Sequence, residues 1–119
     1  MKQRLRLRRQ ADFQTAISGK RFYSGRAMVA FAVTSQRDVS RVGVTVSRMV
    51  KSSVERNRAR RRLRELARLK LLAGDSPLNG VGIRYDVVLI ARPAALVVDF
   101  AELAAEVEQA ALRLSKLTS

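Results

Sequence analysis

Residues 41–68 read RVGVTVSRMVKSSVERNRARRRLRELAR, a strand pattern that leads directly into a helix pattern. In the first seven residues valines alternate with small or polar residues, which predicts a strand packed on one face, with the other face open to a partner. Ser52 followed by Glu55 matches the S-x-x-E capping box, so a helix is expected from about Ser53 to Leu72. This stretch predicts a strand joined to a long basic helix.

The predicted helix has two chemically opposite sides. Helical periodicity places Asn57, Arg61, Arg64 and Arg68 on one stripe and Ala59, Leu63, Leu66 and Ala67 on the opposite side. A solvated face held by pairs such as Arg61 with Glu65 is the plainer interpretation. However, clustered like charges repel one another, and guanidinium groups suit phosphate oxygens. The stripe is therefore interpreted as a surface for a polyanion.

Shorter elements are expected on either side of this unit. Upstream are a mostly extended basic arm over residues 1–9, a short helix over 10–18 ended by a left-handed Gly19, an edge strand over 21–24 and a buried strand over 27–34. Downstream are a loop over 74–82 and a continuous apolar strand over 85–91. The sheet is expected to be mixed and covered mainly on one face.

A terminal helix of roughly sixteen residues is expected after these strands. Asp99 and Glu102 repeat the capping pattern at its start. Its apolar side is expected to comprise Phe100, Leu103, Val107, Ala111 and Leu114.

The amino-acid composition limits the classes of function that the chain can have. The 119 residues, one domain in length, carry a net charge of +14, so the partner is expected to be anionic, and nucleic acid is favoured over membranes or acidic proteins. There is no cysteine and no histidine, which excludes disulfides, thiolate ligands and Ser-His triads and favours an intracellular, cytoplasmic location. No apolar run is long enough for a membrane span or an export signal.

Several short motifs occur in order along nearly the whole chain. They are Arg4-Leu5, Ala11-Asp12-Phe13, Arg41-Val42-Gly43, Arg56-Asn57-Arg58, Tyr85-Asp86 and Ala91-Arg92-Pro93. In this order and spacing the chain resembles the protein subunit of bacterial ribonuclease P, the ribonucleoprotein that removes the 5′ leader from precursor tRNA.

The resemblance implies a single-domain α+β fold of order α-β-β-β-α-β-α, here over residues 1–119. It implies a four-stranded mixed sheet and a left-handed β-α-β crossover around the basic helix, which the general right-handed rule would not predict. It also implies a non-catalytic subunit of an endoribonuclease, with no catalytic or metal-binding residue of its own. The RNA subunit and the RNA–protein–substrate interface would hold Mg²⁺.

The resemblance assigns two sets of binding residues. The helix with the Arg-Asn-Arg motif would hold the catalytic RNA through Arg56, Asn57, Arg58, Arg60, Arg61 and Arg64, to which the stripe adds Arg68. A cleft between the first helix and the sheet would take the single-stranded leader at Phe13, Ile17, Phe31 and Arg48, although both phenylalanines could equally be core residues.

This chain departs from the family pattern at four positions. Met49 and Lys51 replace a basic residue and a glycine in the turn before the basic helix. Ile17 and Phe31 stand where an aromatic residue and a tyrosine are common, so we expect weaker stacking of leader bases.

The partners implied are ribonuclease P RNA and precursor tRNA, with no membrane and no obligate protein partner. Other interpretations stay open from the residues alone. A small ribosomal or RNA-chaperone protein would also be basic, a DNA regulator would need helix-turn-helix spacing, and a protein nuclease would need clustered carboxylates, whereas the aspartates here are scattered.

Overall fold

One four-stranded sheet organises the computed structural model, which describes residues 3–73, 76 and 82–117. The strands are β1 (Lys20–Ser24), β2 (Met28–Ser35), β3 (Arg41–Val46) and β4 (Arg84–Ala91), in the order β1-β2-β4-β3. β2 pairs antiparallel with both β1 and β4, and β3 pairs parallel with β4. The expected mixed sheet is confirmed.

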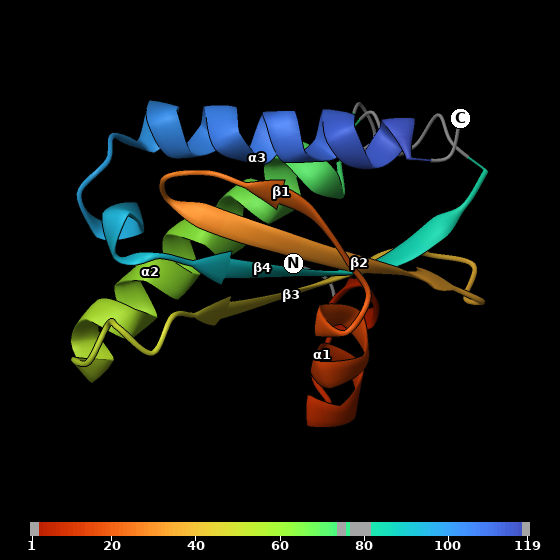
Figure 1. The fold of residues 1–119 in the computed structure, drawn as a ribbon, viewed down its shortest axis with the longest axis horizontal. Helices are drawn as coiled ribbons and strands as arrows, with labels where there is room; N and C mark the ends of the chain where they lie inside the picture. The colour runs from red at the N-terminus through yellow and green to blue at the C-terminus, as the bar shows by residue number, and fades with distance from the viewer. Residues whose placement is uncertain (1–2, 74–75, 77–81, 118–119) are drawn as a thin grey trace.

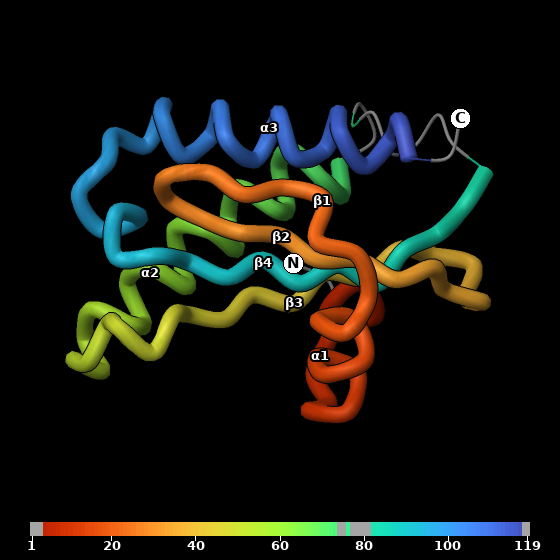
Figure 2. The backbone as a smooth tube through the Cα atoms, in the orientation of Figure 1, coloured from red at the N-terminus to blue at the C-terminus, as the bar shows by residue number. Residues whose placement is uncertain are grey.

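Helices lie on both faces of this sheet. α2 (Ser53–Leu66) and α3 (Phe100–Lys116) pack on one face, and α1 (Gln10–Ile17) packs on the other (Figure 1). The connection from β3 through α2 to the parallel strand β4 is a left-handed crossover, and the tube in Figure 2 follows the same path. The α+β class and the α-β-β-β-α-β-α order are confirmed.

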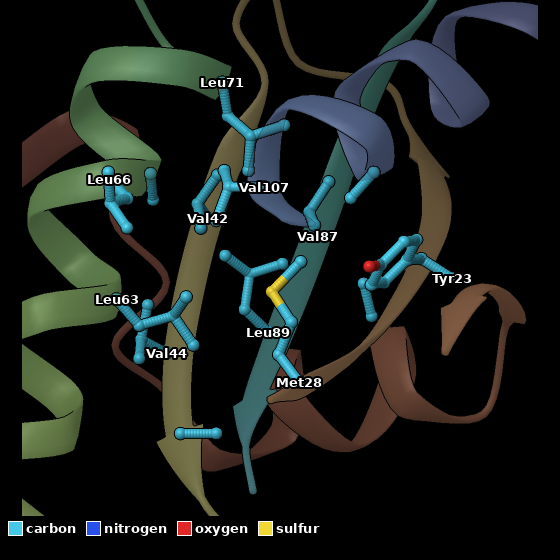
Figure 3. Close-up of a cluster of buried hydrophobic side chains, with 14 of the residues drawn as sticks. Tyr23, Met28, Val42, Val44, Leu63, Leu66, Leu71, Val87, Leu89 and Val107 are labelled. Carbon is cyan, nitrogen blue, oxygen red and sulfur yellow. The ribbon is translucent and has the colours of Figure 1, made fainter. Parts of the chain in front are cut away.

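The main core lies between the sheet, α2 and α3. Leu63 and Leu66 of α2 pack against Val42 and Val44 of β3, and Val107 of α3 belongs to the same cluster (Figure 3). Each fully buried aliphatic side chain contributes about 1.5–3 kcal/mol of transfer free energy. The apolar side predicted for the basic helix, Ala59, Leu63, Leu66 and Ala67, is at most 1% exposed.

The basic helix begins as predicted but ends differently. The Ser52 side chain accepts a hydrogen bond from the Glu55 backbone N–H at 3.4 Å. After Leu66 the backbone continues as a π-helical turn, Ala67–Leu71, which carries Leu71 into the core at 1% exposure. Burial of that leucine favours the wider turn over the regular helix that the sequence predicts.

The arm before α1 packs against the edge strand β3. The backbone N–H of Leu7 donates to the Val42 carbonyl at 3.0 Å, and the Leu7 side chain is buried. The expectation of an extended arm holds only in part, because a 3₁₀ turn occupies Gln3–Leu5. The open second face predicted for β3 is also wrong at Gly43, which Leu7 and Phe13 cover.

Three local predictions about helix ends are wrong. Gly19 does not adopt a positive φ; it is needed because an added Cβ would lie 2.4 Å from the carbonyl oxygen of Ala32. Asp99 makes no side-chain capping hydrogen bond to α3. Phe100 is 47% exposed rather than buried, since it lies at the first residue of α3, beyond the part of the helix that packs on the sheet.

The loop predicted over residues 74–82 falls almost wholly outside the described residues, at 74–75 and 77–81. Within the described part of the chain, no helix is long and apolar enough to cross a membrane.

Candidate nucleic-acid interface

Two adjoining grooves open around the outer edge of β3. The first, of about 830 Å³, lies between the arm and α2; the second, of about 640 Å³, lies between α1 and the end of β3. Arg8, Phe13, Val44 and Arg60 line both grooves. The shared residues make the two grooves neighbouring parts of one concave surface.

This surface combines cations with apolar side chains. In the first groove Arg6, Arg60, Arg61 and Arg64 stand beside Val42 and Val44, and in the second Phe13, Ile17 and Ile90 stand beside Arg8 and Arg48. Guanidinium groups bind phosphates, and an aromatic ring accepts the face of any base. The combination suits an unpaired nucleic-acid strand, which offers phosphates and unstacked bases together.

Most of the predicted stripe on α2 lies in the first groove. Asn57, Arg60, Arg61 and Arg64 line it. Nη1 of Arg60 donates to the Asn57 side-chain oxygen at 2.9 Å, so the asparagine orients that arginine. Arg60 is held at the boundary between the two grooves, where one guanidinium group can reach ligands in either.

Crowding of positive charge in the first groove is visible at Arg64. Partial burial of its guanidinium group, together with the nearby charges of Arg6 and Arg60, lowers the pKa of Arg64 from its usual value. Repulsion between these cations is relieved when an anion binds among them. The groove is therefore electrostatically prepared for phosphate.

Arg56, the first arginine of the motif, faces the protein. Its guanidinium group donates to the carbonyl oxygens of Val46 at 3.1 Å, Ser47 at 2.8 Å and Val50 at 3.0 Å. These carbonyls lie at the last residue of β3 and in the turn that joins β3 to α2. The geometry makes Arg56 a clamp on this turn.

Arg62 is also turned toward the protein. It donates to the carbonyl oxygens of Ala95 at 2.6 Å and Val98 at 2.8 Å, around the 3₁₀ turn Pro93–Leu96. It thereby ties α2 to the connection that leads into α3.

Two further predicted RNA contacts lie outside the linings of both grooves. Arg58 is exposed on α2. Arg68 donates from Nε to Oε2 of Glu65 at 3.3 Å and makes a second, shorter bond to Oε1. The helix pair is thus Glu65 with Arg68, and Arg61 stays directed to the groove.

Three of the four predicted leader residues come together. Phe13, Ile17 and Arg48 line the second groove, with Ile17 37% exposed. Phe31 lies half-buried on β2, in register with Val88 on β4, and is not part of the lining. Arg8 and Gln14, which the sequence did not single out, complete the groove with Thr45 and Ser47, which belong to the face of β3 that was predicted to be open to a partner. For Arg8 the one available signal was the basic arm.

An ion cluster around the buried Arg41 ties α1 to the sheet. Arg41 on β3 donates from Nε and Nη2 to the two carboxylate oxygens of Asp86 on β4, at 3.0 and 2.8 Å. Its Nη1 lies 3.6 Å from the carboxylate of Asp12 in the first turn of α1. The hydrogen bonds that Arg41 donates to Asp86 raise the pKa of Arg41 above its usual value. Three motifs that are far apart in the sequence thus meet at one place.

Among the described residues, no three histidine, cysteine, aspartate or glutamate side chains gather where they could hold a metal ion.

Comparison with known proteins agrees with this architecture. The family model for Ribonuclease P matches residues 1–115. The chain belongs to the ribonuclease P protein family. The ribonuclease P protein component of Acidothermus cellulolyticus is 37% identical over 115 residues, which is 95% of this chain and 90% of that protein. The protein component of Symbiobacterium thermophilum is 38% identical over 110 residues, covering 92% of this chain and 90% of that protein.

Solved ribonuclease P proteins share the fold. The Staphylococcus aureus protein gives a TM-score of 0.72 at 24% identity and covers 97% of this chain and 98% of its own. The Thermotoga maritima protein gives 0.69 at 25% identity, with 96% and 97% covered. As the protein subunit of ribonuclease P, this chain has an RNA partner, and its family is part of an endoribonuclease holoenzyme.

Proposed function

We propose that this subunit holds two RNAs at once. The first groove, walled by Asn57, Arg60, Arg61 and Arg64, binds the catalytic RNA, and the second groove binds the single-stranded 5′ leader of precursor tRNA. The observation that carries the proposal is the shared boundary of the two grooves, where Phe13 and Arg60 line both. A leader held there lies directly beside the RNA that cleaves it.

The protein contributes binding, and the RNA contributes the chemistry. The chain has no histidine or cysteine, so it lacks a histidine general base, a cysteine nucleophile and the usual zinc ligands. We therefore assign Mg²⁺ and hydrolysis of the phosphodiester bond chiefly to the RNA subunit, acting in the cytoplasm without a further obligate protein. The arginines offset repulsion between the two polyanions, which lowers the magnesium concentration that cleavage requires.

Residues 1–119 would act as one RNA-binding unit in this proposal. Arg56 would serve it indirectly, because it holds the turn that carries Arg48 into the second groove. Phe31 would support the leader site from beneath α1 rather than contact bases, since it lies outside the groove lining.

The test is cleavage of a precursor tRNA by a bacterial ribonuclease P RNA at low magnesium, with and without this protein, and with the protein alone. We expect the protein to rescue cleavage at the mature 5′ end and to cleave nothing by itself. RNA binding without any gain in turnover would instead favour a ribosomal or RNA-chaperone role. Cleavage by the protein alone would refute the assigned division of labour.

A further inference from the structure

A third concave site adjoins the arm and shares Arg6 and Arg8 with the first groove. It has a volume of about 280 Å³ and is bounded by the arm, the first turn of α1, the β2–β3 turn and the start of β3. Six arginines line it: Arg4, Arg6, Arg8, Arg9, Arg37 and Arg41. Asp12 is the one acidic residue in the lining.

The lining of this site carries more positive than negative charge. Arg41 at its rear is 9% exposed, and the carboxylates of Asp86 and Asp12 are already engaged with that one guanidinium group. Arg4, Arg6, Arg9 and Arg37 bring further positive charge to the same small hollow, whose lining contains no carboxylate besides that of Asp12. Arginines packed this closely repel one another unless an external anion is bound.

The residue types in the lining indicate which kind of anion the site can bind. The lining contains no aromatic and no aliphatic residue, in contrast to the grooves, where Phe13, Val44 and Ile90 are exposed to a ligand. An unpaired base would find no stacking partner here. Base-paired RNA turns its phosphates outward and keeps its bases in the stack, so it needs no such partner.

We propose that this arginine site binds backbone phosphates of a base-paired RNA segment. The inference rests on the proposed RNA-binding function but concerns a separate site, since Arg9 and Arg37 line neither groove. Arg6 and Arg8 line both this site and the first groove. The arm therefore contributes to a single-strand surface and to a duplex surface and links the two.

The test uses the full chain with Arg9→Gln and Arg37→Gln combined. The matched control combines Arg26→Gln and Lys116→Gln, which removes the same charge from exposed positions outside all three sites. Three probes are compared: a short blunt RNA duplex, a single-stranded RNA oligomer, and inorganic phosphate at constant ionic strength, the last by thermal unfolding.

For the duplex, each lost phosphate contact should lower the slope of log K against log salt by about 0.9. Since the Arg9→Gln/Arg37→Gln variant lacks two arginines, we expect its slope to be lower by about two. The control variant and the single-stranded oligomer should show no such change. An unchanged duplex slope, or equal losses for duplex and single strand, would overturn the proposal. If only stabilisation by inorganic phosphate is lost, the site takes free phosphate and the duplex assignment is wrong.

The cleavage assay separates this inference from the function proposed above. Loss of duplex binding with rescue of cleavage still present would support the third site while leaving the leader groove intact. Failure of the wild-type protein to rescue cleavage would concern the proposed function alone.

Discussion

The Phe13 ring of α1 occupies the space on β3 where any residue other than glycine at position 43 would place its Cβ. A Cβ added to Gly43 would lie 2.5 Å from Cζ and 2.6 Å from Cε1 of the Phe13 ring. The phenylalanine ring therefore rests directly on the backbone of β3, which sets its position where the two grooves meet. The glycine of the Arg41-Val42-Gly43 motif is required by this contact and not by its own backbone conformation, since no described residue has a positive φ.

Gly43→Ala is expected to destabilise the fold by about 1–3 kcal/mol through overpacking and to displace the Phe13 ring. Urea unfolding measures the loss. Gly82→Ala is the matched control, because nothing lies within 4 Å of its added Cβ. Equal effects of the two substitutions would contradict the contact.

The Tyr23 hydroxyl is expected to lose its proton at a higher pH than an ordinary tyrosine. Burial first, then the charge and hydrogen bond of Glu106, raise the pKa of Tyr23 from 10.0 to about 12. The folded state therefore favours the neutral phenol, so this contribution to stability is complete below pH 10 and is lost as the pH rises toward 12. Ultraviolet titration of the Tyr85→Phe variant isolates Tyr23, and a midpoint near 10 would refute the prediction.

Substitutions at Arg56 and Arg58 should affect different properties, folding stability at Arg56 and RNA affinity at Arg58. Arg56→Ala removes three hydrogen bonds to carbonyls from a charged donor and is expected to cost at least about 2 kcal/mol of folding stability. Arg58→Ala, at an exposed position, should change stability by no more than about 0.5 kcal/mol and act only on RNA affinity. Denaturant unfolding and filter binding together test both; a stable Arg56→Ala protein would argue against the clamp.

Arg61 and Arg68 lie on the same stripe of α2 but differ in their partners. Arg61→Gln should lower the salt slope of binding to ribonuclease P RNA by about 0.7–0.9, one phosphate contact. Arg68→Gln should lower it less, since Glu65 already engages Arg68. Identical slopes for the two variants would show that lining the groove does not decide which arginine contacts an RNA phosphate.

Ile17→Phe should strengthen leader binding. Ile17 lines the second groove and is partly exposed, so an aromatic ring there can stack on a base, worth about 1 kcal/mol or about fivefold in affinity. Fluorescence anisotropy with a labelled single-stranded leader provides the measurement. The control is Leu112→Phe, at an exposed position of α3 outside both grooves. If Ile17→Phe gives no gain in affinity, Ile17 does not contact the leader.

Local patterns were the part that the sequence predicted well. Valine alternation in β3, the Ser52 cap and the apolar side of α2 depend on periodicities of the backbone and on neighbours within a few residues. The excess of positive charge indicated a nucleic-acid partner, because net charge depends on composition and not on the fold, and the family resemblance identified that partner as RNA. The predictions that failed, among them those at Gly19, Gly43, Asp99 and Phe100, depended on packing by a distant segment or on the exact end of a helix.

By itself the sequence determined the order of elements, the basic stripe and, through its motifs, the family resemblance. Only the tertiary structure decided which arginines line the first groove. Arg56 and Arg62 are turned to carbonyls of neighbouring segments, Arg68 to Glu65, and Arg60, Arg61 and Arg64 to the groove. Helical periodicity gives a side chain its direction, but its partner depends on what the rest of the fold brings within hydrogen-bonding distance.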